Sequence, residues 1–100
     1  MVHEDLKLPG AELPAYCQRN GIRRLELFGS ATRADFAPQS DVDLLVDFRP
    51  EARIGFLALS RMQRELSELF GRRVDLVPRG GLKPVIASSV LREAEPLYAE

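Results

Sequence analysis

Residues 41–46 place two aspartates in an otherwise apolar run that reads Asp-Val-Asp-Leu-Leu-Val. The run is short, contains β-branched side chains and follows a loop with proline and serine, so it predicts a β-strand. Because successive side chains of a strand point to opposite faces, Asp41 and Asp43 emerge on the same face. Two adjacent carboxylates repel each other and lose hydration, and a divalent cation is the usual compensation. The run therefore indicates a metal site on a strand.

Helix and strand patterns alternate along the rest of the chain. Helices are predicted at residues 11–20, at residues 55–70, and from Pro84 until Pro96. Strands are predicted at residues 22–28, from Asp41 until Arg49-Pro50, and at residues 72–77. Strands interleaved with helices predict an α/β (α+β) fold, in which a small mixed β-sheet is flanked by helices and the loops at one edge form the site.

The long central helix has an apolar stripe with a 3-4-3 spacing, formed by Leu59, Met62, Leu66 and Leu69. Residues 31–35 are compatible with a short helix, and residues 37–40 and 78–81 are predicted to be loops. Leu97 and Tyr98 could add a short edge strand or pack on the core, and both alternatives are open.

The size and composition indicate one globular domain. One hundred residues fit a flexible N-terminal segment at residues 1–10 and a single domain at residues 11–100. A net charge of −1 argues against direct nucleic acid binding by the whole surface. We expect neither a membrane span nor a signal peptide, and the single cysteine, Cys17, fits a reducing cytoplasm.

Gly29 and Ser30 end a predicted strand, and ten residues separate them from Asp41. Glycine lets the backbone approach a ligand closely, and the helix that follows presents free N–H groups to an anion. The Ser30 hydroxyl can add a hydrogen bond, and Arg33, one turn further on, can contact phosphate oxygens with its guanidinium. These residues would hold a polyphosphate while the carboxylates hold its metal ions.

Asp75 supplies a third carboxylate in a Val-Asp-Leu-Val context that resembles the context of Asp43. If the two strands are neighbours, all three carboxylates converge at one end of the sheet. Carboxylates, water and phosphate oxygens suit Mg²⁺, and two such ions ~3.5–4 Å apart stabilise an in-line displacement at phosphorus. Each motif alone has a simpler interpretation as a turn, a strand edge or a solvated charge. Their joint occurrence favours the site.

Several charged residues around these motifs have two interpretations. Asp47 could approach the site from the same strand face as Asp43, or it is a charge at the strand end. Four basic residues surround the third strand and the loop after it: Arg72, Arg73, Arg79 and Lys83. They could attract a nucleotide or an acidic partner, or form a solvated basic edge.

The combined pattern resembles the DNA polymerase beta-type nucleotidyltransferase superfamily. The residues that carry the resemblance are Leu27-Phe28-Gly29-Ser30, the run at 41–46, and Val74-Asp75-Leu76. The length is similar to that of the minimal nucleotidyltransferase branch, which includes the MntA-type antitoxins that accompany HEPN-domain toxins. The resemblance extends over about residues 11–94.

This resemblance implies a role for each motif residue. Asp41 and Asp43 would ligate two Mg²⁺ ions, and Asp75 would ligate the catalytic ion and help to activate the attacking hydroxyl. Gly29 and Ser30 would bind the β- and γ-phosphates. Arg33 matches a basic position of the family, although the glycine that often follows it is Ala34 here.

The implied reaction is transfer of AMP from ATP to a hydroxyl, with release of pyrophosphate. By resemblance the acceptor would be a tyrosine of a HEPN-domain toxin, whose RNase activity is thereby switched off. Two alternatives are open. The chain could mask its partner sterically without catalysis, or it could modify a small molecule, which the missing acceptor domain disfavours.

Overall fold

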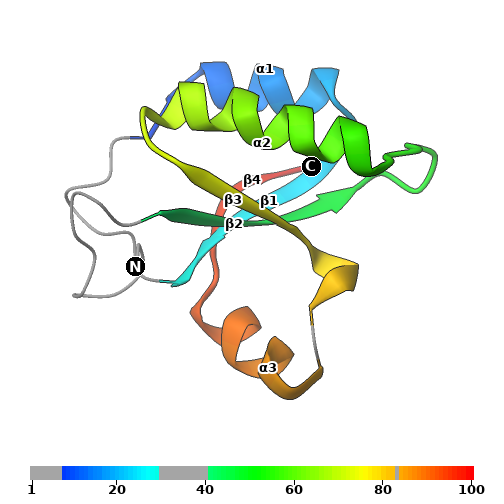
Figure 1. The fold of residues 1–100 in the computed structure, drawn as a ribbon, viewed down its shortest axis with the longest axis vertical. Coiled ribbons are helices and arrows are strands. Elements are labelled where there is room, and N and C mark those ends of the chain that lie inside the picture. The colour runs from blue at the N-terminus through cyan, green and yellow to red at the C-terminus, as the bar shows by residue number, and fades with distance from the viewer. Residues whose placement is uncertain (1–7, 30–40, 83) are drawn as a thin grey trace.

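A mixed sheet with the strand order β3-β2-β1-β4 forms the centre of the structure (Figure 1). The computed structural model describes residues 8–29, 41–82 and 84–100, and within these ranges the sheet has four strands. They are β1 (Ile22–Phe28), β2 (Val42–Phe48), β3 (Val74–Pro78) and β4 (Glu95–Ala99). β1 pairs antiparallel with β2 and β4, whereas β2 and β3 are parallel. The predicted small mixed sheet is confirmed.

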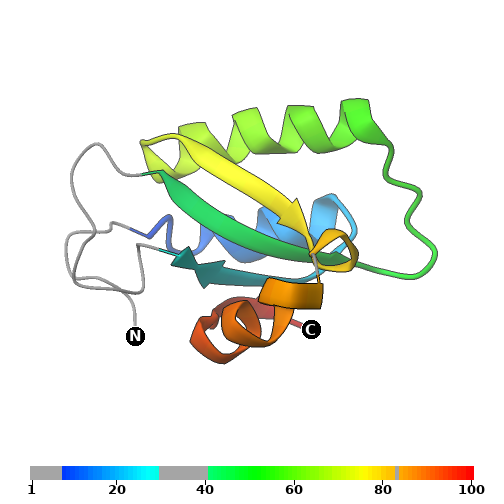
Figure 2. The ribbon, with the colours of Figure 1, turned by 60° about the horizontal axis from the view of Figure 1, so that its bottom comes forward.

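The helices of the described part of the chain lie on both sides of this sheet (Figure 2). Two of them, α1 (Glu12–Arg19) and α2 (Phe56–Phe70), lie on one face. The third, α3 (Pro84–Glu93), lies on the opposite side. All three were predicted from sequence. Gly71 follows the last residue of α2 and adopts the left-handed conformation typical of a helix C-terminus.

The main core lies between the sheet and the pair α1 and α2. In each of β2 and β3, alternate residues face this core, as the period of two in a strand requires. The core side chains of these two strands are Val42, Leu44, Val46, Val74 and Leu76. Met62 and Leu66 of the predicted stripe are buried in α2, and Leu59 and Leu69 pack against the same cluster. The apolar stripe therefore marked the face of α2 that covers the sheet.

Cys17 packs in α1 as part of the same core, where it is fully buried. Burial raises the pKa of its thiol to about 12, because the thiolate would lose its hydration. The thiol is therefore protonated and unreactive at neutral pH.

Some predicted bounds differ from those in the structure. Residues 78–81 were expected to be a loop, but Pro78 ends β3 and a 3-10 helix, η2, spans Arg79–Gly81. Proline can end an edge strand because it has no N–H to donate. β3 begins at Val74 instead of at residue 72, and α3 ends at Glu93. The predicted helix at 31–35 and loop at 37–40 lie outside the described residues.

The C-terminal segment satisfies both alternatives that the sequence left open. β4 is an edge strand beside β1. Leu97 and Tyr98 on that strand also pack against the core. In the ranges that the structure describes, no helix combines the length and the apolar character needed to span a membrane.

We expect Leu66→Ala to lower the free energy of unfolding by about 2–5 kcal/mol, because it opens a cavity in the core. Leu66 is fully buried, whereas Leu57 on the same helix is 83% exposed. Leu57→Ala is therefore the matched control and should change stability little. Urea denaturation of both variants measures the difference, and equal losses would contradict this assignment of the core.

Candidate active site

Asp43 on β2 and Asp75 on β3 occupy directly paired positions of the parallel ladder. Paired residues of neighbouring strands point to the same face, so the two carboxylates emerge side by side. Because Val42, Leu44 and the other core residues fill the face under α1 and α2, these carboxylates lie on the opposite face. Asp43 is half-buried and Asp75 is exposed. The condition that the two strands be neighbours is confirmed.

Asp41 lies at the same end of the sheet, immediately before β2. The Val42 N–H donates to the carbonyl of Arg73 at 2.8 Å, which holds the starts of β2 and β3 together. The Nε of Arg73 lies 3.9 Å from Oδ2 of Asp41, and both side chains are exposed. An exposed ion pair of this length contributes little. Asp41 is therefore held only loosely by Arg73.

Asp41 precedes β2 and lies near Arg73 at the exposed strand end. Among the residues that the structure describes, no group of three or more His, Cys, Asp and Glu side chains is arranged to hold a metal ion. Asp43 and Asp75 nevertheless fit Mg²⁺ chemically, because this ion uses one or two carboxylates together with water and phosphate oxygens.

Gly29 follows β1 directly and lies against the carboxylate of Asp43. Phe28, the last residue of β1, pairs with Asp43 across the antiparallel ladder. Gly29 has a φ of +75°, which L side chains rarely adopt. A β-carbon at this position would overlap Oδ2 of Asp43 and lie 3.2 Å from its Cγ. Gly29 therefore lies against one member of the carboxylate pair, Asp43. Ser30 and Arg33 lie outside the described residues.

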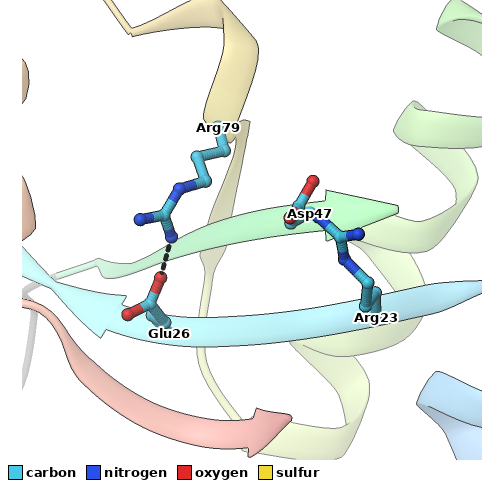
Figure 3. Close-up of polar contacts among 4 residues, drawn as sticks. All are labelled: Arg23, Glu26, Asp47 and Arg79. Atoms are coloured by element: carbon cyan, nitrogen blue, oxygen red, sulfur yellow. Dashed lines mark hydrogen bonds and ion pairs between the residues drawn. The ribbon is translucent and has the colours of Figure 1, made fainter. Parts of the chain in front are cut away.

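Two ion pairs connect side chains of β1 with side chains of η2 and β2 (Figure 3). Glu26 of β1, only 9% exposed, accepts a hydrogen bond from Arg79, the first residue of η2. Glu26 pairs with Leu45, two residues from the Phe28–Asp43 pair along the same ladder. The contact therefore connects the strand that leads to Gly29 with the segment after β3. In the sequence, the signal for this ion pair is that Glu26 stands between two apolar residues, Leu25 and Leu27.

The second ion pair decides between the two interpretations of Asp47. Arg23 donates to Oδ2 of Asp47 at 2.6 Å, and both side chains are partly exposed. This contact raises the pKa of Arg23. Asp47 is thus a paired charge at the end of β2, and Arg79 is paired with Glu26 instead of lying on a solvated basic edge. Lys83 lies outside the described residues.

A separate cleft of about 430 Å³ lies between α1 and α2, on the other side of the sheet from the carboxylates. Within it, the Tyr16 hydroxyl donates to Oε1 of Glu65 at 2.7 Å. Burial, and then this hydrogen bond, raise the pKa of Tyr16 above its ordinary value. The residues that line this cleft include neither the paired carboxylates nor the glycine turn.

Comparisons with known proteins identify the family of this chain. Residues 13–97 match the family model of the nucleotidyltransferase domain. The chain belongs to this family. The matched residues include Gly29 and both strands of the carboxylate pair.

Related proteins and structures extend the match. The chain is 43% identical over 76 residues to the protein adenylyltransferase MntA of Thermococcus cleftensis, which covers 76% of this chain and 75% of that protein. It is 40% identical to a solved structure described as a candidate minimal nucleotidyltransferase, with a TM-score of 0.72 and coverage of 89% and 88%. A chain in the complex of a tri-AMPylated HEPN toxin of Shewanella oneidensis with MNT antitoxin is 18% identical, with a TM-score of 0.67 and coverage of 92% and 71%. This last likeness shows the fold. The family predicted from the motifs is confirmed.

We expect Gly29→Ala to destabilise the domain more than Gly71→Ala does. Both glycines have a positive φ, so each alanine incurs roughly 1–2 kcal/mol of left-handed backbone strain. A β-carbon at Gly71 meets nothing within 4 Å, whereas one at Gly29 displaces the Asp43 carboxylate. Urea denaturation measures the two losses. An equal loss would show that the contact between Gly29 and Asp43 is unimportant.

We expect Arg79→Met to lower the free energy of unfolding by roughly 1–3 kcal/mol, because it leaves the buried Glu26 carboxylate without its guanidinium. The additional change Glu26→Gln should restore much of this loss, since it removes the uncompensated charge. Arg23→Met removes an exposed pair and should have little effect. Thermal and urea denaturation at pH 7 test this order, and a larger loss in Arg23→Met would contradict it.

Proposed function

We propose that this domain transfers AMP from ATP to a hydroxyl of a partner protein, specifically a tyrosine of a HEPN-domain toxin, and thereby acts as an antitoxin. The observation that carries the proposal is the pairing of Asp43 with Asp75 beside Gly29 in a nucleotidyltransferase domain. The 43% identity to a protein adenylyltransferase supports AMP as the transferred group. The similarity to a chain from a HEPN toxin–antitoxin complex supports the class of partner.

Asp41, Asp43 and Asp75 are the residues that would hold two Mg²⁺ ions in this reaction. When bound, Mg²⁺ neutralises phosphate charge and stabilises the oxygens that attack and leave. Asp43 is half-buried and lies against Gly29, whereas Asp41 and Asp75 are exposed. The set combines one half-buried carboxylate with two that are accessible from solvent.

The chain's own groups also bind and orient the substrates in this proposal. Gly29 leaves the backbone open to the triphosphate, and Ser30 and Arg33 add a hydroxyl and a guanidinium for its β- and γ-phosphates. Asp75 receives the proton of the acceptor hydroxyl. The hydroxyl oxygen then forms a bond to the α-phosphorus, the bond from that phosphorus to the bridging oxygen breaks, and pyrophosphate leaves.

The position of Asp75 suits a protein acceptor. Its strand, β3, is at the edge of the described sheet, and its side chain is exposed. A tyrosine side chain that projects from a partner surface can therefore reach the carboxylate from solvent.

The test is incubation of the chain with ATP, Mg²⁺ and the co-expressed partner, followed by intact-mass measurement. We expect the partner to gain the mass of one or more AMP groups. Asp43→Asn should slow this gain by at least about 100-fold, because it removes charge stabilisation at the reacting phosphate. Asp47→Asn is the matched control, since Asp47 lies on the same strand but is paired with Arg23, and it should retain activity.

Three outcomes would overturn the proposal. The wild-type chain could leave the partner's mass unchanged while still blocking its toxicity, which would make it a steric mask. Asp43→Asn could transfer AMP as fast as the wild type. Transfer could also continue unchanged after chelation of divalent cations, which would contradict the role of Mg²⁺.

A further inference from the structure

β3 has a free outer edge with respect to the described sheet, because the strand order places it beside β2 only. The carbonyl of Arg73 accepts a hydrogen bond from β2. In a parallel ladder, residues alternate between facing the neighbouring strand and facing away from it. The backbone of Asp75 therefore faces β2, and the N–H groups of Val74 and Leu76, on either side of it, point away from the sheet.

Two side chains of α2 accept hydrogen bonds from these outward N–H groups. The Val74 N–H donates to Oγ of Ser67 at 2.9 Å, and the Leu76 N–H donates to Oε1 of Gln63 at 2.9 Å. The Ser67 hydroxyl in turn donates to the carbonyl of Gln63 at 2.7 Å, which orients its oxygen. We refer to these two side chains, Gln63 and Ser67, as the β3 clamp.

The spacing of the clamp matches the spacing of the strand. Residues four apart in a helix are separated by about 6 Å along its axis, and residues two apart in a strand by about 6.6 Å. In both ribbon views β3 starts beside the C-terminal end of α2 and runs back at an angle to the helix (Figures 1 and 2). Gln63 and Ser67 therefore reach alternate N–H groups together. A slip of β3 by one residue would break both bonds and turn the carboxylate of Asp75 to the other face.

We infer that Gln63 and Ser67 are positioning residues that hold Asp75 opposite Asp43. The inference rests on the proposed function, because it assigns the clamp to the carboxylate that would contact metal and acceptor. β2 fixes Asp75 through the sheet on one side, and α2 fixes both neighbouring N–H groups on the other. An exposed carboxylate on an edge strand thereby obtains a defined position.

The test compares Gln63→Met, which removes the acceptor oxygen but keeps the length, with Gln63→Glu, which keeps an acceptor. Gln18→Met makes the same chemical change at an exposed position of α1 and is the control. Gln63→Met should lower kcat for AMP transfer by about 10- to 100-fold, the usual effect of removing a group that orients a metal ligand. KM for ATP should change little, because the phosphate-binding turn follows β1. Gln63→Glu should recover most of the rate.

A second measurement needs neither partner nor nucleotide. Mn²⁺ alone is titrated into the isolated chain, and paramagnetic broadening of the Asp75 and Asp43 amide signals is followed by NMR. In Gln63→Met, broadening at Asp75 should require about tenfold more Mn²⁺, and the Leu76 amide should exchange with solvent faster. In Gln18→Met neither quantity should change. If Gln63→Met does not fold, Ser67→Ala replaces it, because this change removes the other acceptor. In Ser67→Ala the Val74 amide should exchange with solvent faster, and broadening at Asp75 should require more Mn²⁺.

Two results would overturn the inference: unchanged Mn²⁺ broadening at Asp75, or a rate loss in Gln63→Met that Gln63→Glu does not recover. Failure of the proposed function gives a different result, because the wild-type chain would then transfer no AMP. The Mn²⁺ titration and the exchange of Leu76 would still decide whether the clamp positions Asp75.

Discussion

The parallel register between β2 and β3 is the constraint on which the rest of the structure depends. It pairs Val42 with Val74, Asp43 with Asp75 and Leu44 with Leu76, so apolar side chains share one face and carboxylates the other. A change of register by one residue would bury a carboxylate under α2 and expose core residues, at a large cost in desolvation. The hydrophobic core therefore enforces the pairing of Asp43 with Asp75, although neither residue contributes to that core.

Each face of the sheet has its own physical role. Under α1 and α2, burial of aliphatic side chains supplies the stability of the domain. Elsewhere on the sheet, Glu26 forms an ion pair with Arg79, and Asp47 forms one with Arg23. The strand that ends at Gly29 and the segment that follows β3 are connected by the first of these pairs. The residues that stabilise the domain and the carboxylates of the proposed chemistry therefore lie on opposite faces of the sheet.

Much of the fold could be predicted because its signals are local. The stripe in α2, the left-handed glycine after it and the alternating strands depend on neighbours in sequence, and their predicted positions agree with the structure. The 3-10 helix at Arg79–Gly81 was missed because its residues are equally typical of a loop. The sequence could not decide whether Leu97 and Tyr98 form an edge strand or pack on the core. The strand depends on pairing with the edge of β1, which no local pattern reveals.

By itself, the sequence determined the motifs, their spacing and the family, because Asp43, Asp75 and the glycine turn have fixed positions along the chain. Only the tertiary structure decided which charges meet. It placed Gly29 against Asp43, paired Asp47 with Arg23, kept Asp41 near Arg73, and brought Gln63 and Ser67 to the edge of β3. These contacts join residues on separate elements, and their partners are selected by packing and strand register instead of by sequence distance.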